Sequence, residues 1–211
     1  MVNNMGRLPL DSLRKEIKFL FPNYKLTHYR NLIQQLGWKE EYPKRKVHSI
    51  YFDTIKNDLL FDSIYGLGKR EKIRLRYYNE FNDVHFERKV KNDIYGFKIQ
   101  KIKPNITIIN NENLGIIANE ATEWIGHKVF PASQIHYNRY YYNNTINNIR
   151  ITVDTNIETE DLQNNKKRAL NNYCVCEVKS GIDEASNLPF NLMPTRFSKY
   201  AFSRVGNDSN Y

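Results

Sequence analysis

The chain has few of the features that mark exported, membrane-spanning or disulfide-linked proteins. Its 211 residues include only two cysteines, Cys174 and Cys176, which excludes a disulfide framework and leaves too few thiols for a closed zinc site. No run of 18 apolar residues occurs, and the opening segment MVNNMGRLPL lacks the apolar core of a secretory signal. We therefore expect a cytoplasmic protein without a membrane span, in which both cysteines serve packing.

Acidic residues are also scarce relative to cations. The chain has 32 Lys and Arg against 23 Asp and Glu, a formal net charge of +9. Such a surplus must be solvated or met by an anionic partner, and it favours a phosphate-rich one. The length and the 40% content of hydrophobic residues predict a single domain over residues 1–211, with its core at about 14–204.

Aromatic residues are abundant and concentrated in short segments that alternate polar and apolar positions. This pattern is typical of half-buried strands, so the chain is predicted to be mainly β, an α+β fold with peripheral helices. The Asn-rich stretches 143–148 and 164–172 are predicted to be exposed loops. Helices are expected at 27–36 (capped by Thr27 and ended by Gly37), at 57–64, as a pair within 113–126, and from about 196. Strands are expected at 14–21, 47–53, 72–79, 84–90, 135–142, 149–154 and 173–180.

The most informative pattern is which face of each strand carries charge. In residues 72–76, KIRLR, cations occupy every second position and aliphatic residues the others, so one face is basic and the other apolar. A solvated sheet face normally mixes short polar residues with charges of both signs. A closed barrel with a charged interior explains the repetition better. The same alternation groups Arg14, Glu16 and Lys18; Glu87, Lys89 and Lys91; Arg150, Thr152 and Asp154; and Glu177 with Lys179.

A basic interior of this kind requires a bound polyanion, because facing cations repel and are partly desolvated. Residues 66–103 alone contain 11 Lys and Arg against 5 Asp and Glu. Isolated carboxylates among these cations, at Glu16, Glu87 and Glu177, are candidate ligands for Mg²⁺ or Mn²⁺. The alternative for each is a structural ion pair with a neighbouring lysine. We favour the metal role for Glu177, because it lies in an otherwise apolar strand.

Eight segments, in this order, resemble the VTC domain. This domain is the polyphosphate polymerase module of the vacuolar transporter chaperone family, within the triphosphate tunnel metalloenzyme superfamily, and the resemblance spans about residues 14–204. The segments are RKEIKF at 14–19, HSIYFDT at 48–54, REKIRLRYYN at 70–79, FERKVK at 86–91, YNRYYY at 137–142, IRITVDT at 149–155, CEVKS at 176–180 and FSKYAFSR at 197–204.

The resemblance implies a closed antiparallel eight-stranded β-barrel tunnel that binds ATP and polyphosphate with a divalent metal, Mn or Mg. It further implies transfer of the terminal phosphoryl group of ATP to a polyphosphate chain, with Glu177 holding the metal. Arg14 stands where the superfamily often has a first glutamate, leaving Glu16 alone, which disfavours triphosphate hydrolysis. The phosphate-binding residues carried over by motif are Lys18, Arg74, Arg76, Lys89, Lys98, Arg139, Arg150, Ser198 and Lys199, of which Arg74, Arg76, Lys89 and Lys199 would be catalytic.

This chemistry requires positioning and charge neutralisation and no general base, so the five histidines are expected to be ordinary surface or partly buried residues. Two rival functions stay open. A basic cavity could bind polyphosphate or inositol polyphosphate as a sensor without catalysis. A nucleic-acid binder is less favoured, because no nucleic-acid motif is present and the cations alternate on apolar-backed strands. Coupling to translocation would require a separate membrane partner chain.

Overall fold

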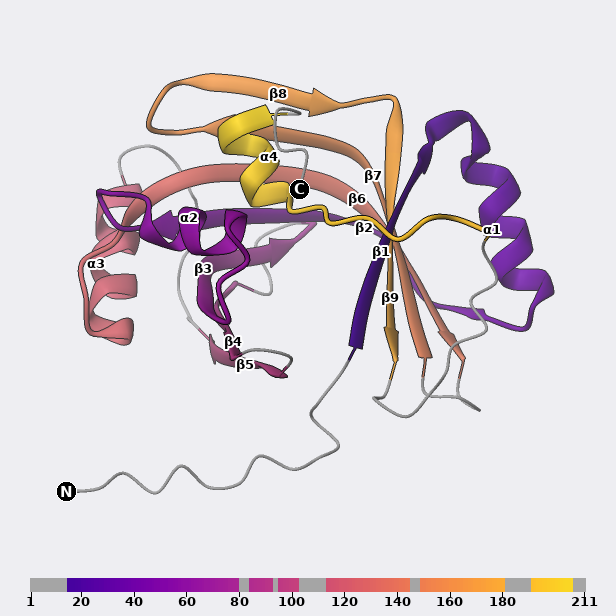
Figure 1. Ribbon diagram of the computed structural model, residues 1–211, viewed down its shortest axis with the longest axis horizontal. Coiled ribbons are helices and arrows are strands. Elements are labelled where there is room, and N and C mark those ends of the chain that lie inside the picture. Colours follow the sequence, from indigo (N-terminus) through magenta and orange to yellow (C-terminus); the bar gives the residue numbers. More distant parts are fainter. Residues whose placement is uncertain are drawn as a thin grey trace.

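The computed structural model describes residues 15–79, 84–92, 95–102, 113–144, 149–180 and 191–206. Within these residues the chain forms one nine-stranded antiparallel sheet and four α-helices (Figure 1). None of these helices is long and apolar enough to cross a membrane. The elements are β1 (Lys15–Pro22), a 3-10 turn (Asn23–Lys25), α1 (Leu26–Gln35), β2 (Lys39–Asp53), α2 (Asp58–Ile64), β3 (Lys69–Tyr78), β4 (His85–Asn92), β5 (Tyr95–Ile102), α3 (Leu114–Ile125), β6 (Phe130–Asn144), β7 (Ile149–Asp161), β8 (Lys166–Leu170), β9 (Tyr173–Ser180) and α4 (Lys199–Val205).

The sheet is curled but open. Its strand order is β1-β9-β7-β6-β2-β3-β4-β5, and β8 pairs only with β7. The two edge strands, β1 and β5, do not pair with each other within the described residues. The predicted closed eight-stranded barrel is therefore wrong. The curl instead brings β1 to β4, where Lys89 Nζ lies 2.8 Å from both carboxylate oxygens of Glu16. Strand β4 is already paired with β3 and β5, so its backbone offers β1 no free edge for a ladder.

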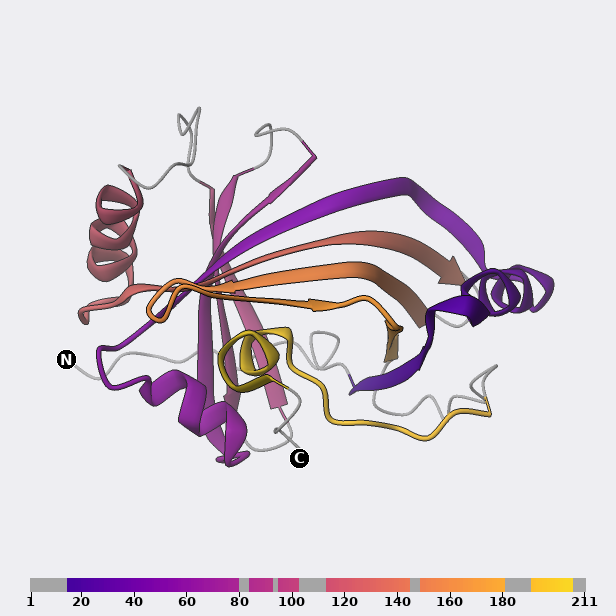
Figure 2. The same ribbon diagram turned by 90° about the horizontal axis from the view of Figure 1, so that it is seen from above.

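Long, bent strands produce this curl. Strands β2, β6 and β7 arch across the molecule (Figure 2), and their ladders contain register shifts, one between His136 and Asn138 of β6. Such irregularities bend a strand and increase its twist. We call the face on the inside of the curl, which carries Lys18, Arg74 and Glu177, the inner face, and the opposite one the outer face.

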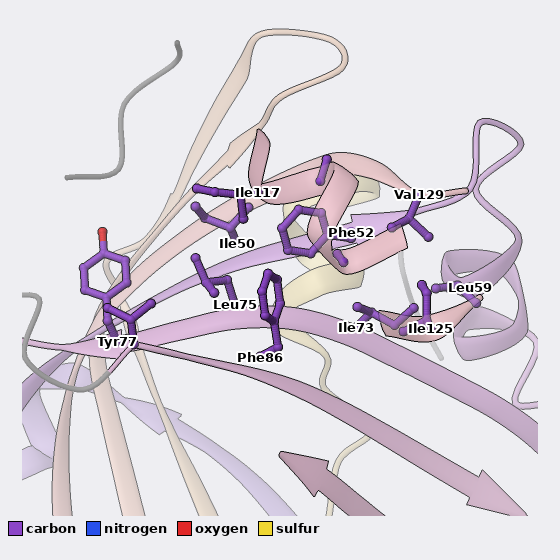
Figure 3. Close-up of a cluster of buried hydrophobic side chains, with 13 residues drawn as sticks. Ile50, Phe52, Leu59, Ile73, Leu75, Tyr77, Phe86, Ile117, Ile125 and Val129 are labelled. Atoms are coloured by element: carbon purple, nitrogen blue, oxygen red, sulfur yellow. The ribbon is translucent and has the colours of Figure 1, made fainter. Parts of the chain in front are cut away.

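The outer face holds most of the apolar core, as the alternation of residue types predicts. Under α1, Phe19 and Phe21 pack with Cys174 and Cys176, which are free and buried. Under α3, Ile73 packs with other aliphatic and aromatic residues in a second cluster (Figure 3). A third cluster lies on the inner side, where α4 packs against β6 and β7 (Figure 1) and buries Tyr200 and Phe202. One part of the inner face is therefore apolar and covered, and the rest carries the charges.

Several predicted boundaries differ from the structure. The predicted loop at 164–172 contains β8, a short polar strand whose pairing with β7 no alternation reveals. Strand β5, which contains Lys98, was also not predicted. Thr27 does not cap α1, which begins at Leu26, and 113–126 forms one helix rather than two. The last helix begins at Lys199, and Arg14 lies outside the described residues.

Candidate functional site

The residues expected to bind phosphate lie on the inner face or beside it. The ladders place Lys18 opposite Glu177, Arg74 opposite Glu87, and Arg139 opposite Asp154. Period-two alternation thus aims charged side chains from seven strands toward one region. The expected residues are Lys18 on β1, Arg74 and Arg76 on β3, Lys89 on β4, Lys98 on β5, Arg139 on β6, Arg150 on β7, Glu177 on β9, Ser198 just before α4 and Lys199 at its start.

Asp154 is the buried counter-ion of two of these cations. Arg139 donates to both of its oxygens, Nε to Oδ1 at 2.6 Å and Nη2 to Oδ2 at 2.7 Å, and Lys199 Nζ lies 2.5 Å from Oδ2. Burial opposes ionisation of Asp154, but Arg139 and Lys199 outweigh it and lower the pKa of the carboxyl. Motif transfer did not assign Asp154, although its alternation with Arg150 and Thr152 places it on this face.

Glu87 has the same role for the arginines of β3. Its Oε2 accepts from Arg74 Nε at 2.6 Å and lies 3.7 Å from Arg76 Nη1, and its Oε1 lies 3.2 Å from Lys98 Nζ. Burial would raise the pKa of Glu87, but Arg74 and Arg76 lower it far below the usual range. Glu87 therefore forms the structural ion pair that was the alternative to metal binding.

Two tyrosines complete the arginine sites. Arg74 Nη1 donates to the Tyr51 hydroxyl at 2.9 Å, and Arg76 Nη2 donates to the Tyr137 hydroxyl at 3.1 Å. Both tyrosines are buried as expected of packing residues. Their contacts with the guanidinium groups could not be predicted, because the alternation of residues along a strand does not show which side chain a tyrosine hydroxyl will reach. The tyrosines fix the orientation of the two forks.

Glu16 and Glu177 form the candidate metal position. Lys179 Nζ lies 3.0 Å from Glu177 and 3.7 Å from Glu16, and Lys18 Nζ lies 3.9 Å from Glu177. Burial opposes ionisation of Glu177, but these lysines lower its pKa well below the usual range. The described residues contain no group of three His, Cys, Asp or Glu placed to hold a metal. Two hard carboxylates fit Mg²⁺ or Mn²⁺ only if phosphate oxygens complete the coordination.

Lys72 is a cation of the site that motif transfer did not assign. Burial and the neighbouring charges of Lys18, Lys89 and Arg74 lower its pKa well below the usual value. Its Nζ donates to Ser198 Oγ at 3.0 Å, and no carboxylate among the described residues lies within ion-pair distance. The alternation in KIRLR already places Lys72 on the basic face. Its unneutralised charge is the part of the site that most requires an anion.

The chain matches a known protein family and resembles several solved structures in fold. The VTC domain model matches residues 13–204, so the chain belongs to the VTC domain family. No curated protein matched the chain. A proposed adenylate cyclase from Vibrio parahaemolyticus is 11% identical, with 82% of this chain and 79% of that chain covered and a TM-score of 0.53. At this identity the likeness concerns the fold alone.

Two further solved structures have lower scores. One is a proposed adenylate cyclase from Bacillus halodurans, with 13% identity, 80% of this chain and 81% of that chain covered, and a TM-score of 0.48. The other is HpAC1 from Hippeastrum, a proposed adenylyl cyclase described as revealing a dominant triphosphatase activity. It has 13% identity, 78% of each chain covered and a TM-score of 0.44.

Proposed function

We propose that this VTC domain is a metal-dependent ATP:polyphosphate phosphotransferase that lengthens polyphosphate with the terminal phosphoryl group of ATP. The observation that carries the proposal is Lys72. It lies among Lys18, Lys89 and Arg74 with no carboxylate partner in the described part of the chain. An extended polyanion would supply the counter-charge that Lys72 lacks and contact the neighbouring cations as well, and membership of the VTC family supports this class of ligand.

The arginines would act as clamps and the lysines as point charges. Glu87 fixes the orientation of the planar fork of Arg74, Asp154 fixes that of Arg139, and Tyr137 fixes that of Arg76. Such forks hold phosphate oxygens in a defined geometry. Lysine ammonium groups at Lys89 and Lys199 would neutralise charge that develops on the transferring group. The acceptor phosphate is already ionised near neutral pH, so no side chain has to remove a proton.

Glu177, with Glu16 beside it, would hold Mg²⁺ or Mn²⁺ together with phosphate oxygens. A metal bound there would supply charge neutralisation to the phosphate groups that react. To free Glu177, Lys179 and Lys18 would have to turn from it, and to free Glu16, Lys89 and Lys179 would have to turn away. These lysines would then contact phosphate instead.

A second candidate function is non-catalytic binding of polyphosphate or inositol polyphosphate. It is favoured by one observation, namely that both candidate metal ligands already contact Lys179. A metal must compete with this lysine, whereas a polyanion sensor requires only the cations. In either case we expect the partner to be a polyphosphate rather than a nucleic acid.

The test is incubation of the purified protein with ATP, with and without a polyphosphate primer, in Mn²⁺ or Mg²⁺, followed by gel detection of long polyphosphate. We expect product with wild type and none with Arg74→Ala. Arg88→Ala is the matched control, because Arg88 pairs with Glu71 at 2.7 Å and points to the outer face. Tripolyphosphate binding without turnover would favour the sensor, and no binding of any polyphosphate would contradict both functions.

A further inference from the structure

Two buried side chains that the proposed mechanism does not use, Asp53 and Tyr200, are bonded to each other. Tyr200 on α4 donates its hydroxyl hydrogen to Asp53 Oδ2 at 2.5 Å, across 147 positions of the sequence. Only 0% of Asp53 and 1% of Tyr200 is exposed to solvent. Neither side chain can touch a substrate, so any part that they play in the reaction must act through neighbouring residues.

Asp53 is a fixed anchor at the end of β2. Its Oδ1 accepts from the backbone N–H groups of Thr54 at 2.8 Å and Leu59 at 2.9 Å. Its Oδ2 accepts from the N–H group of Leu60 at 2.9 Å, in addition to the Tyr200 hydroxyl. Burial raises the pKa of Asp53, and these four donors oppose that effect. A carboxylate held by three backbone groups has little freedom to move, so it fixes the position of the hydroxyl.

The anchored tyrosine determines where Lys199 points. Consecutive residues of an α-helix point about 100° apart around its axis, so fixing Tyr200 sets the rotation of α4. In this orientation Lys199 Nζ lies 2.5 Å from Asp154 Oδ2 and 4.7 Å from the ring centre of Tyr137. The Tyr137 hydroxyl also accepts from Arg76. The lysine is therefore held beside the arginines of the site.

The ring of Tyr200 contacts a second part of the site. It stacks on Tyr51, with 4.9 Å between ring centres and 5° between ring planes, and the Tyr51 hydroxyl accepts from Arg74 Nη1 at 2.9 Å. Both tyrosines belong to the apolar cluster between α4 and the sheet. Close packing restricts the positions that a buried ring can adopt, so Tyr200 supports the residue that holds Arg74. One side chain is thus connected to cations on two elements, α4 and β3.

We propose that Tyr200 is a positioning residue, which holds Lys199 and Arg74 at the spacing that phosphoryl transfer requires. The assignment rests on the proposed function, in which Arg74 clamps phosphate and Lys199 neutralises charge on the transferring group. A displacement of about 1 Å caused by a residue away from the chemistry can cost about 100-fold in rate. A merely structural tyrosine would affect stability alone, whereas a positioning residue affects turnover in protein that still folds and still binds.

Tyr200→Phe tests the proposal, because it keeps the stacked ring and removes only the hydroxyl that reaches Asp53. Turnover of ATP into polyphosphate, tripolyphosphate binding and thermal unfolding are measured on the same preparation. We expect kcat to fall about tenfold or more, with KM for ATP and the affinity for tripolyphosphate within about twofold of wild type. Asp53→Asn weakens the same bond from its other end and should also lower kcat. In a Lys199→Met background, Tyr200→Phe should have little further effect, because the hydroxyl acts through that lysine.

Tyr142→Phe is the matched control, because it removes a buried hydroxyl that accepts from Arg30 Nε at 2.8 Å under α1, on the outer face. It should lower stability without lowering kcat. If wild type makes polyphosphate but kcat is unchanged in Tyr200→Phe, or falls equally in both Phe variants, the positioning role alone is overturned. Additive effects of Tyr200→Phe and Lys199→Met would overturn it too. If wild type makes no polyphosphate, the phosphotransferase and the positioning role fail together.

Discussion

At Glu177, two lysines lie where the proposed reaction needs a metal ion. Lys179 at 3.0 Å and Lys18 at 3.9 Å neutralise the carboxylate. Glu177→Gln keeps the shape of the side chain and removes the charge. We expect it to keep polyphosphate affinity and to lose metal-dependent ATP turnover by roughly 10²-fold, a few kcal/mol of transition-state stabilisation. Binding and turnover measured on the same preparation separate the two effects.

The control for this variant is Glu71→Gln, which removes a carboxylate from the outer face and should leave turnover unchanged. Full activity of Glu177→Gln at low Mn²⁺ would assign Glu177 to the ion pair with Lys179 alone. That result would favour the alternative stated from the sequence, in which Glu177 forms a structural ion pair and binds no metal.

His48 is the residue that should most clearly couple stability to pH. Its Nδ1 lies 2.5 Å from Nδ1 of His136, and its ring stacks on Tyr77 with 4.5 Å between centres. Burial first, and then His136 and Lys46, lower the pKa of His48 to about 4. The unfolded chain has an ordinary histidine pKa of about 6.5. Unfolding therefore takes up a proton below this value, and the free energy of unfolding falls as the pH decreases from about 6.5 toward 4.

Denaturant unfolding at several pH values between 7 and 4.5 measures this dependence. We expect His48→Gln to flatten the slope, even if its stability at pH 7 is lower because the contact with His136 is altered. His28→Gln, on the exposed side of α1, should keep the wild-type slope. An unchanged slope in His48→Gln would show that other groups take up the proton.

At the scale of single elements, strand alternation predicted which charged side chains share a face, but the closed barrel that it suggested is wrong. Because side chains alternate with a period of two, the sequence alone assigned Lys18, Arg74 and Glu177 to one face. The contact that joins the ends of the curl, between Glu16 and Lys89, links residues far apart in sequence. No local pattern encodes it, and none indicates that β4 is already paired on both edges. The closed barrel was inferred first from the alternation of charge and then from the resemblance, and the strand pairing of the sheet shows that both inferences were wrong on this point.

On strand β3, cations that lie on the same face have different partners. Lys72 has only a neutral partner, Ser198, whereas Arg74 holds the buried Glu87. Lys72→Met should keep or raise stability without ligand, because it relieves repulsion from Lys18 and Lys89. Arg74→Met should lower stability, by about 3 kcal/mol when a buried pair loses one partner. Both should weaken polyphosphate binding.

Thermal or chemical unfolding of the two variants, with and without tripolyphosphate, checks this contrast. Both substitutions remove one positive charge from the same face of one strand, so each is the control for the other. Equal losses of stability would mean that the ion pair with Glu87 contributes nothing beyond the packing of a long side chain.

For the whole molecule, the excess of cations makes stability depend on bound anions. The inner carboxylates Asp154, Glu87 and Glu177 have pKa values lowered by the cations that surround them, against the effect of burial. Carboxylates with lowered pKa values stabilise the fold above their ordinary pKa of about 4, and this stability is lost as the pH falls further. Acid therefore removes the internal counter-ions and leaves the cations facing one another.

A polyanion replaces those counter-ions, so tripolyphosphate should shift the acid-unfolding midpoint to lower pH. A ligand at 100 times its dissociation constant adds about 2.7 kcal/mol to the free energy of unfolding when it binds only the folded state. Acid titrations followed by circular dichroism, with tripolyphosphate or with NaCl at the same ionic strength, measure the shift. Salt should shift the midpoint less, because screening is weak for buried pairs. Equal shifts would mean that the cations respond to ionic strength alone, and the inner face would not be a polyanion site.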